Sequence, residues 1–274
     1  MSRILIALGV VLMLGLAALF TLDRMGIPIT PHDRAVVQLV ARNIEARGGA
    51  EAWNDVSSMR MSGQMDLGQG MHVPYVLEQK RPGKMCLEFV FQDETAVQCA
   101  DGKTGWKVAP FRGRTSPEPM TAQELRETAD STDPYGLLID YAARGHEVEL
   151  LGQEAVKGRV AYKLQVTLPG GAIRWLYLDV ESALEVKLEA IRLIAGNEQR
   201  IETFFYDWQP ADGLLIARRQ ESRPVGAKDM NFLTVEKVVV NPPLDDARFA
   251  MPAKNGARDG AGRSGDDNLA RAAS

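Results

Sequence analysis

The stretch VAYKLQVTL, residues 160–168, decides the fold class of this 274-residue chain. Its apolar residues occupy every second position, and a period of two is typical of a β-strand with one buried face. Gly170-Gly171 then turns the chain into more runs of the same kind. These runs lie at residues 174–180, 184–193, 200–208, 214–222 and 231–240. Short turns between successive strands predict an antiparallel meander for the second half of the chain.

A second β-signal surrounds the two cysteines. Residues 85–91 read as a strand, and a turn at Gln92-Asp93 would return the chain so that Cys86 faces Cys99. Directly opposed cysteines of a hairpin are within bonding range. In an oxidising compartment we therefore expect a structural disulfide, which would stabilise the fold by about 3 kcal/mol. A redox-active pair is the less favoured alternative, because the C-x-x-C spacing is absent.

Helix signals flank the strands. Thr30-Pro31 predicts a helix start and Gly48-Gly49 its end. Thr121 to Glu124 reads as a capping box, with Leu125 as the first apolar anchor of its helix. Asp133-Pro134 predicts another helix, which would end at Gly145. A short helical turn is also expected at 51–53 and a last one at 245–249.

The first strands begin near residue 56, and Met59, Met61 and Met65 share one strand face. Altogether the chain predicts a mainly β fold of about 11–12 strands in one large antiparallel sheet. The apolar face of such a sheet needs a cover. Because few helices are available, the cover could leave a cavity between the sheet and the helices.

Seventeen consecutive apolar residues, 4–20, follow Arg3 near the start of the chain. This length lies between that of a secretory signal and that of a membrane-spanning helix, so residues 1–25 are either a signal peptide or an uncleaved membrane anchor. Arg3 favours an N-terminus in the cytosol and an exported remainder. The remainder divides into a folded domain at 30–252 and a disordered tail at 253–274, which is rich in Gly, Ala, Ser, Asp and Arg.

Composition and motifs exclude several functions. With 32 basic and 36 acidic residues the net charge is −4, which argues against nucleic-acid binding. The three histidines lack a second His or a Cys at metal-ligand spacing, so exposed polar positions explain them best and no metal is expected. Neither a nucleophile elbow nor a phosphate-binding glycine loop is present, so we predict neither an enzyme nor a cofactor. Carboxylates along the strands, such as Glu88, Glu147, Glu149 and Glu202, are interpreted as a solvated sheet face.

The apolar side chains that could line the cavity are the candidate binding site. Methionine is unbranched and polarizable, which suits a lining that adapts to flexible chains. The candidates are Met59, Met61, Met65, Leu87, Phe89, Phe91, Leu137, Leu138, Tyr141, Tyr162 and Leu164. On these residues alone, an ordinary well-packed core is the preferred explanation.

Eight segments together resemble a known family. They are IEARGG (44–49), SMRMSGQM (58–65), KRPGKMCLEF (80–89), DGKTGWKVAPFRG (101–113), PEPMTAQEL (117–125), YLDVESALEVK (177–187), ADGLLIARRQES (211–222) and VEKVVVNPPLDDARFAMP (235–252). In this order they resemble the outer-membrane lipoprotein-sorting proteins, the LolA-like group of Gram-negative periplasmic proteins. The likeness runs from about His32 to Pro252, and its motifs are specific for the fold rather than for the ligand.

The resemblance implies an incomplete antiparallel β-barrel covered by a lid of α-helices, with acyl chains held in the hydrophobic space between them. It therefore favours a cavity over a solid core. It further implies a periplasmic carrier of lipids or lipoproteins, with an inner-membrane donor and an outer-membrane acceptor as candidate partners. We also expect a monomer. An anchored envelope sensor or assembly factor is the alternative, because an uncleaved segment at 4–20 would tether the protein to the inner membrane. The cysteine pair is a departure from the family pattern, because a disulfide is not expected in every family member.

Overall fold

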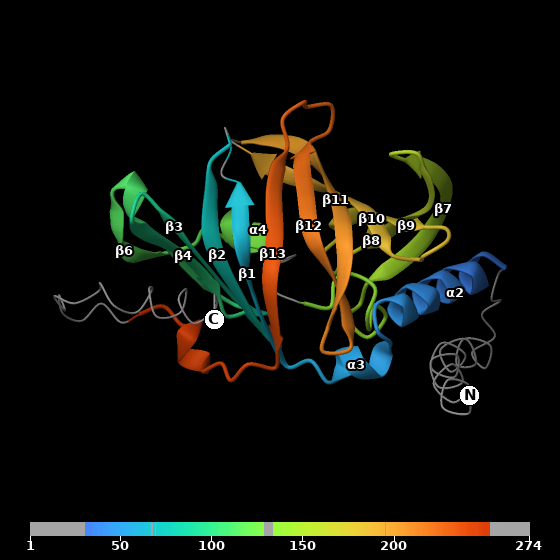
Figure 1. The fold of residues 1–274 in the computed structure, drawn as a ribbon, viewed down its shortest axis with the longest axis horizontal. Coiled ribbons are helices and arrows are strands. Elements are labelled where there is room, and N and C mark those ends of the chain that lie inside the picture. Colours follow the sequence, from blue (N-terminus) through green and yellow to red (C-terminus); the bar gives the residue numbers. More distant parts are fainter. Residues whose placement is uncertain (1–30, 67, 69, 129–133, 195, 253–274) are drawn as a thin grey trace. The chain divides into compact units, whose positions relative to one another are not determined.

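The computed structural model describes residues 31–66, 68, 70–128, 134–194 and 196–252, and thirteen strands make up its sheet (Figure 1). The strand order is β6-β5-β4-β3-β2-β1-β13-β12-β11-β10-β9-β8-β7. Among the described strands the sheet is not closed, because β6 and β7 end the order without pairing with each other. The predicted mainly β, incompletely closed antiparallel fold with few helices is therefore confirmed.

The elements follow the sequence periodicity closely. The first-half strands are β1 (Ser58–Asp66), β2 (His72–Lys80), β3 (Lys84–Phe91), β4 (Glu94–Ala100), β5 (Gly105–Ala109) and β6 (Arg114–Pro119). The second-half strands are β7 (Glu147–Val156), β8 (Arg159–Thr167), β9 (Ile173–Asp179), β10 (Glu185–Ile194), β11 (Asn197–Ala211), β12 (Leu214–Pro224) and β13 (Asn231–Val240). The helices are α2 (Pro31–Ala46), α3 (Ala50–Asn54) and α4 (Ala122–Thr128), with 3-10 turns η1 (Pro110–Arg112) and η3 (Asp246–Arg248).

The described residues pack into two compact units. Unit 1 comprises the described residues within Met1–Asp55, Leu137–Ile216 and Ser222–Ala227. Unit 2 comprises those within Val56–Gly136, Ala217–Glu221 and Lys228–Ser274.

In unit 1, α2 packs on the strands through one apolar stripe. Val36, Leu39 and Val40 are buried at the i, i+3, i+4 spacing of a helix face. They contact a cluster on β8 and β9 that includes Leu164 and Leu178, and Figure 1 shows α2 beside β7. This packing fixes the helix, since isolated helices of this length are marginal in water.

The end of α2 is held by close backbone contacts. Gly48 has a φ of 115°, and a Cβ there would lie 2.4 Å from the Gly213 carbonyl oxygen. The Leu215 amide donates to the Arg47 carbonyl at 3.0 Å. The Arg47 side chain forms a buried ion pair with Glu185 at 3.3 Å. The predicted glycine end of the helix is confirmed, and glycine is needed at Gly48 for both conformation and space.

In unit 2 the predicted cysteine hairpin is confirmed. Cys86 pairs with Cys99 in the β3–β4 register, and the two form a disulfide. Gln92 and Asp93 have φ values of 54° and 60°, as a two-residue type I′ turn requires. Trp106 and Phe249 pack on the bond, and the Trp106 indole donates to the Phe249 carbonyl at 3.0 Å. The disulfide is therefore part of a packed core on one face of unit 2.

The structure corrects the prediction of a helix from Asp133-Pro134 to Gly145. Its described residues, 134–145, form successive turns instead. Asp140 has a φ of 53°, which a right-handed helix cannot accommodate. The sequence does not predict strand β6, because it contains Pro117 and Pro119. Proline has no backbone N–H to donate to a neighbouring strand, so it argues against a strand in a sequence.

The interpretation of carboxylates and histidines as solvated is wrong at three positions. Glu88 is buried against Arg248, and Glu202 is buried against Arg223 at 2.7 Å. His146 is buried, and its Nδ1 lies 3.0 Å from the Leu137 carbonyl oxygen. In each case the partner is not a neighbour in the sequence, so local polarity could not indicate burial.

The predicted signal or anchor segment and the predicted disordered tail lie outside the described residues. None of the helices that the structure describes has the length and apolar character needed to cross a membrane.

Candidate functional site

Unit 2 carries an apolar surface on one face of β1–β4 and β13. In antiparallel pairs, opposed residues point to the same face. Met65 faces Val73 and Leu233, Tyr75 faces Phe89, and Leu77 faces Leu87. We call this cluster the aromatic surface; it consists of Met65, Val73, Tyr75, Leu77, Leu87, Phe89, Phe91, Ala96, Phe111 and Leu233.

The centre of the aromatic surface is buried and its margin is not. Val73, Tyr75 and Phe89 are buried, whereas Leu87 and Phe91 are only half-buried. The Phe111 ring from η1 lies 5.4 Å from that of Phe91, in an edge-to-face arrangement. A margin of half-buried apolar side chains can still gain free energy by contacting an apolar partner.

Burial also raises the pKa of Tyr75, whose phenol lies at the centre of the aromatic surface. The pKa of Tyr75 lies above its usual range, first because the hydroxyl is desolvated and second because the Glu236 carboxylate is near. Tyr75 therefore stays neutral at physiological pH and behaves as part of an apolar surface.

Helix α4 packs at the β5 end of this face. Gly105, opposed to Ala100, leaves room for it: a Cβ there would lie 2.6 Å from the Met120 sulfur and 3.2 Å from Leu125 Cδ1. This contact places Leu125, the predicted apolar anchor of the helix, against the strand.

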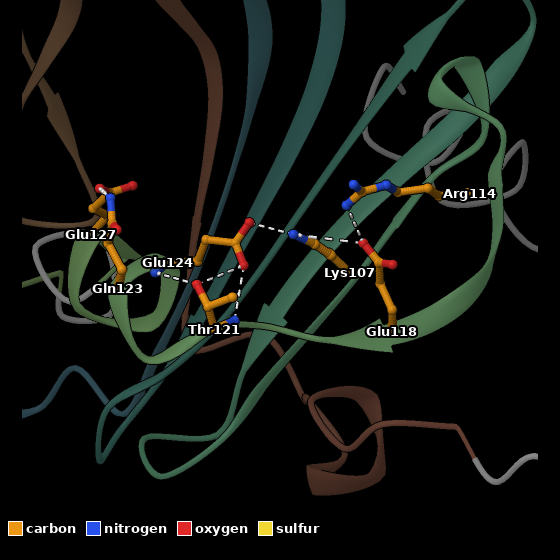
Figure 2. Close-up of polar contacts among 7 residues, drawn as sticks. All are labelled: Lys107, Arg114, Glu118, Thr121, Gln123, Glu124 and Glu127. Carbon is orange, nitrogen blue, oxygen red and sulfur yellow. Dashed lines mark hydrogen bonds and ion pairs between the residues drawn. The ribbon is translucent and has the colours of Figure 1, made fainter. Parts of the chain in front are cut away.

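Polar contacts fasten α4 to β5 and β6 (Figure 2). The Lys107 ammonium of β5 forms ion pairs with Glu124 of α4 and, at 3.6 Å, with Glu118 of β6. Arg114 adds a 2.7 Å ion pair with Glu118. The Thr121 amide donates to Glu124 Oε2 at 2.9 Å, and the Glu124 amide donates back to the Thr121 hydroxyl at 3.2 Å. The predicted capping box is confirmed, and its glutamate also ties the helix to the sheet.

The double role of Glu124 yields a first prediction. Lys107, followed by the Thr121 amide, lowers the pKa of Glu124. The stabilisation that the ionised Glu124 carboxylate contributes is therefore complete above its ordinary pKa of 4.5. It is lost as the pH falls through the lower pKa that Glu124 has in the folded protein. Glu124→Gln should speed amide hydrogen exchange in α4 while changing the global free energy of unfolding by no more than about 1 kcal/mol.

The matched control is Glu127→Gln on the same helix, which leaves the Lys107 contact intact. Equal exchange rates in the α4 amides of Glu124→Gln and wild type at pH 7 would contradict this role.

Unit 1 carries the second apolar surface, on β7–β10 beneath α2. Leu164 faces Leu150 and Leu176, and Leu176 faces Leu188. We call this cluster the leucine surface; its buried members are Val36, Leu39, Val40, Leu138, Leu164, Val166, Leu176 and Leu178. Its half-buried margin consists of Ile44, Leu137, Tyr141, Val148, Leu150, Tyr162, Leu168 and Leu188. Burial raises the pKa of Tyr141, so this phenol too is neutral at physiological pH.

The predicted cavity-lining residues divide between these two surfaces. Met65, Leu87, Phe89 and Phe91 belong to the aromatic surface. Leu137, Leu138, Tyr141, Tyr162 and Leu164 belong to the leucine surface. Met59 and Met61 point to the same strand face as Met65, but they belong to neither cluster. Their contact with a ligand stays a prediction.

Sequence reasoning missed members that lack a strong local signal. Phe111 lies in a 3-10 turn, and its contacts with Phe89 and Phe91 are tertiary. Lys107 carries a charge on a strand next to an apolar face, and its position is explained by two tertiary partners, Glu124 of α4 and Glu118 of β6.

The chemistry available at these surfaces is non-covalent. Their side chains are aliphatic, aromatic, phenolic or thioether groups. Among the described residues, no group of three or more His, Cys, Asp and Glu side chains could hold a metal ion. Such surfaces suit the burial of apolar ligands.

Comparison with known proteins places the fold. The sequence matches no protein-family profile, and no curated protein sequence is significantly similar to it. Among solved structures, a LolA superfamily protein from Nitrosomonas europaea is similar at a TM-score of 0.53 and 13% identity, over 78% of this chain and 96% of that one. A DUF1329 family protein from Desulfovibrio piger is similar at a TM-score of 0.57 and 13% identity, over 81% and 98%. At these identities the likeness shows the fold alone, and this chain has a LolA-like fold.

Proposed function

We propose that this protein is an exported carrier that binds the acyl chains of lipids or lipoproteins in the periplasm without covalent chemistry. The observation that carries the proposal is the pair of apolar surfaces, each with a half-buried margin, on an open antiparallel sheet of LolA-like fold. A hydrophobic partner would cover those margins.

The energetics favour a long chain as the cargo. Each methylene removed from water contributes about 0.8 kcal/mol, so even a partly buried acyl chain would bind well. The same figure requires that release be coupled to an acceptor, because a tightly bound chain does not leave into water. An inner-membrane donor and an outer-membrane acceptor complete this scheme.

The carrier proposal predicts bound lipid. Protein isolated without detergent should release lipid that mass spectrometry detects after denaturation. Leu87→Arg places a cation on the half-buried margin of the aromatic surface and should weaken binding of a fluorescent long-chain fatty acid by about tenfold or more. The expected loss is in affinity, with the strand order retained.

Val90→Arg is the matched control. Val90 lies on the same strand and is also half-buried, but it points to the opposite face. Native protein free of lipid, together with equal fatty-acid affinities of Leu87→Arg and Val90→Arg, would overturn the carrier proposal.

An anchored envelope sensor or assembly factor is the second candidate. The apolar run at 4–20 favours it, because an uncleaved segment of that length would prevent free shuttling. Fractionation of tagged cells separates the two. Release by osmotic shock supports the shuttle, and retention in the membrane after a carbonate wash supports the anchored form.

A further inference from the structure

Unit 1 holds a pocket that is separate from both apolar surfaces. It has a volume of about 400 Å³ where the β7–β8 and β9–β10 turns meet β11, and none of its lining residues belongs to the aromatic or the leucine surface. Its size falls within the range of small-molecule sites. Four aromatic side chains of β11 line it, with the Phe205 and Trp208 rings 6.4 Å apart and Phe204 and Tyr206 next to them in the sequence.

Lys157 brings a cation to these rings. Its ammonium lies 4.0 Å from the Phe204 ring centroid and 5.0 Å from that of Tyr206, and it donates to the Tyr206 hydroxyl. The aromatic faces thus hold the charge at the pocket. An ammonium placed in this way adds positive potential where an incoming anion would lie.

The backbone at Lys157 is also unusual. Lys157 and Gly158 have φ values of 47° and 83°, which makes the β7–β8 connection a type I′ turn. Asn, Asp and Gly are the residues that this turn favours at its first central position, and lysine is not. Asp207, also in the lining, has a φ of 54°. Two non-glycine residues in the left-handed region of one pocket are the kind of outlier that clusters at binding sites.

The charges at the pocket favour an anion. Lys157 and Arg159 line it as cations, and Asp207 is the carboxylate in the lining. Arg159 also interacts electrostatically with Asp179, which accepts hydrogen bonds from the Ser182 amide and hydroxyl at 2.8 and 3.0 Å. Asp179 thus offsets part of the Arg159 charge, and Lys157, held against the Phe204 and Tyr206 rings, is the main attraction for an anion.

We propose that this pocket binds the anionic head of a small amphiphile, with the anion against Lys157 and Arg159 and a compact apolar body against Phe205 and Trp208. The shared chemistry is a phosphate ester on a short apolar group, whether it comes from a lipid headgroup or from a free metabolite. This site does not depend on acyl-chain binding by the aromatic or leucine surface, so either proposal can fail alone.

Hexyl phosphate tests the proposal by isothermal titration calorimetry with the full chain. It should bind at least tenfold more tightly than either hexanol or inorganic phosphate, because each of those supplies only half of the contacts. Lys157→Asn should weaken its binding by about tenfold, the loss expected for one charge-assisted contact. Asparagine fits the type I′ turn better than lysine, so the urea midpoint of the variant should stay equal or rise.

Arg159→Gln should weaken hexyl phosphate binding to a similar degree, whereas Lys103→Asn, at an exposed turn of unit 2, should leave it unchanged. Equal affinities for wild type and Lys157→Asn would overturn the proposal, as would hexanol binding as tightly as hexyl phosphate. If inorganic phosphate binds as tightly as hexyl phosphate, the pocket recognises the anion alone, and the proposal that it binds an amphiphile is overturned.

Discussion

Replacing Gly63 with alanine is expected to lower the free energy of unfolding by about 3 kcal/mol, or to prevent folding. Gly63 lies in β1 where the pairing with β13 shifts register, between Ser62 and Gly63. A Cβ at this position would lie 1.9 Å from the Thr234 carbonyl oxygen and 3.1 Å from the Glu236 amide nitrogen. Both contacts are with backbone, so no side-chain rotation can relieve them and the strands themselves must separate.

Urea unfolding followed by circular dichroism measures this effect. Ser62→Ala, the neighbouring position on the same strand, is the matched control and should change stability by less than about 0.5 kcal/mol. If Gly63→Ala has the same urea midpoint as Ser62→Ala, then the close approach of β1 and β13 is not as tight as these distances indicate.

Removing Arg248 is expected to cost about 3 kcal/mol of stability, because it leaves a carboxylate buried without its cation. Arg248 Nε lies 2.9 Å from Glu78 Oε2, and Nη2 lies 2.5 Å from Glu88 Oε1. The Glu78 and Glu88 side chains are only 3% and 9% exposed. Glu78 keeps a second partner, Arg60 at 2.7 Å, whereas Glu88 loses its ion pair with Arg248 in Arg248→Met.

A second substitution distinguishes charge from packing. Glu88→Gln in the Arg248→Met background should recover part of the lost stability, since the buried carboxylate is then replaced by a neutral amide. Arg126→Met, at an exposed position of α4, is the control for the loss of a cation and should be close to neutral. A double variant no more stable than Arg248→Met alone would show that the arginine acts through packing of its aliphatic stem.

The sequence predicts most of the sheet because its information is local. Alternation over residues 160–168 and the glycine turns specify strands, and β13 matches the predicted 231–240. The cysteine hairpin is predictable to the residue because a two-residue turn fixes the register. In contrast, β6 carries prolines, and the turns at 134–145 include positive φ values at Gly136, Asp140 and Gly145 that are incompatible with one continuous helix.

The candidate site is less predictable, because contacts between residues far apart in the sequence bring its members together. Phe89 and Phe91 follow from strand alternation, but Phe111 joins them from a 3-10 turn. The burial of Glu88 depends on Arg248, which lies 160 residues further along the chain. The pocket at Lys157 needs two turns, β7–β8 and β9–β10, to meet strand β11, and no spacing in the sequence indicates that they do.

The unpaired ends of the strand order have a consequence for how the protein behaves in a crowded compartment. Among the described strands, β6 and β7 each have one edge without a partner strand, and such an edge offers hydrogen-bonding groups to a neighbouring chain, which is a usual route to fibrils. Pro117 and Pro119 interrupt the row of backbone donors on β6, and Glu147 and Glu149 place like charges on β7. Two identical molecules that met along β7 would bring glutamates together, and the repulsion between these charges disfavours polymerisation through this edge.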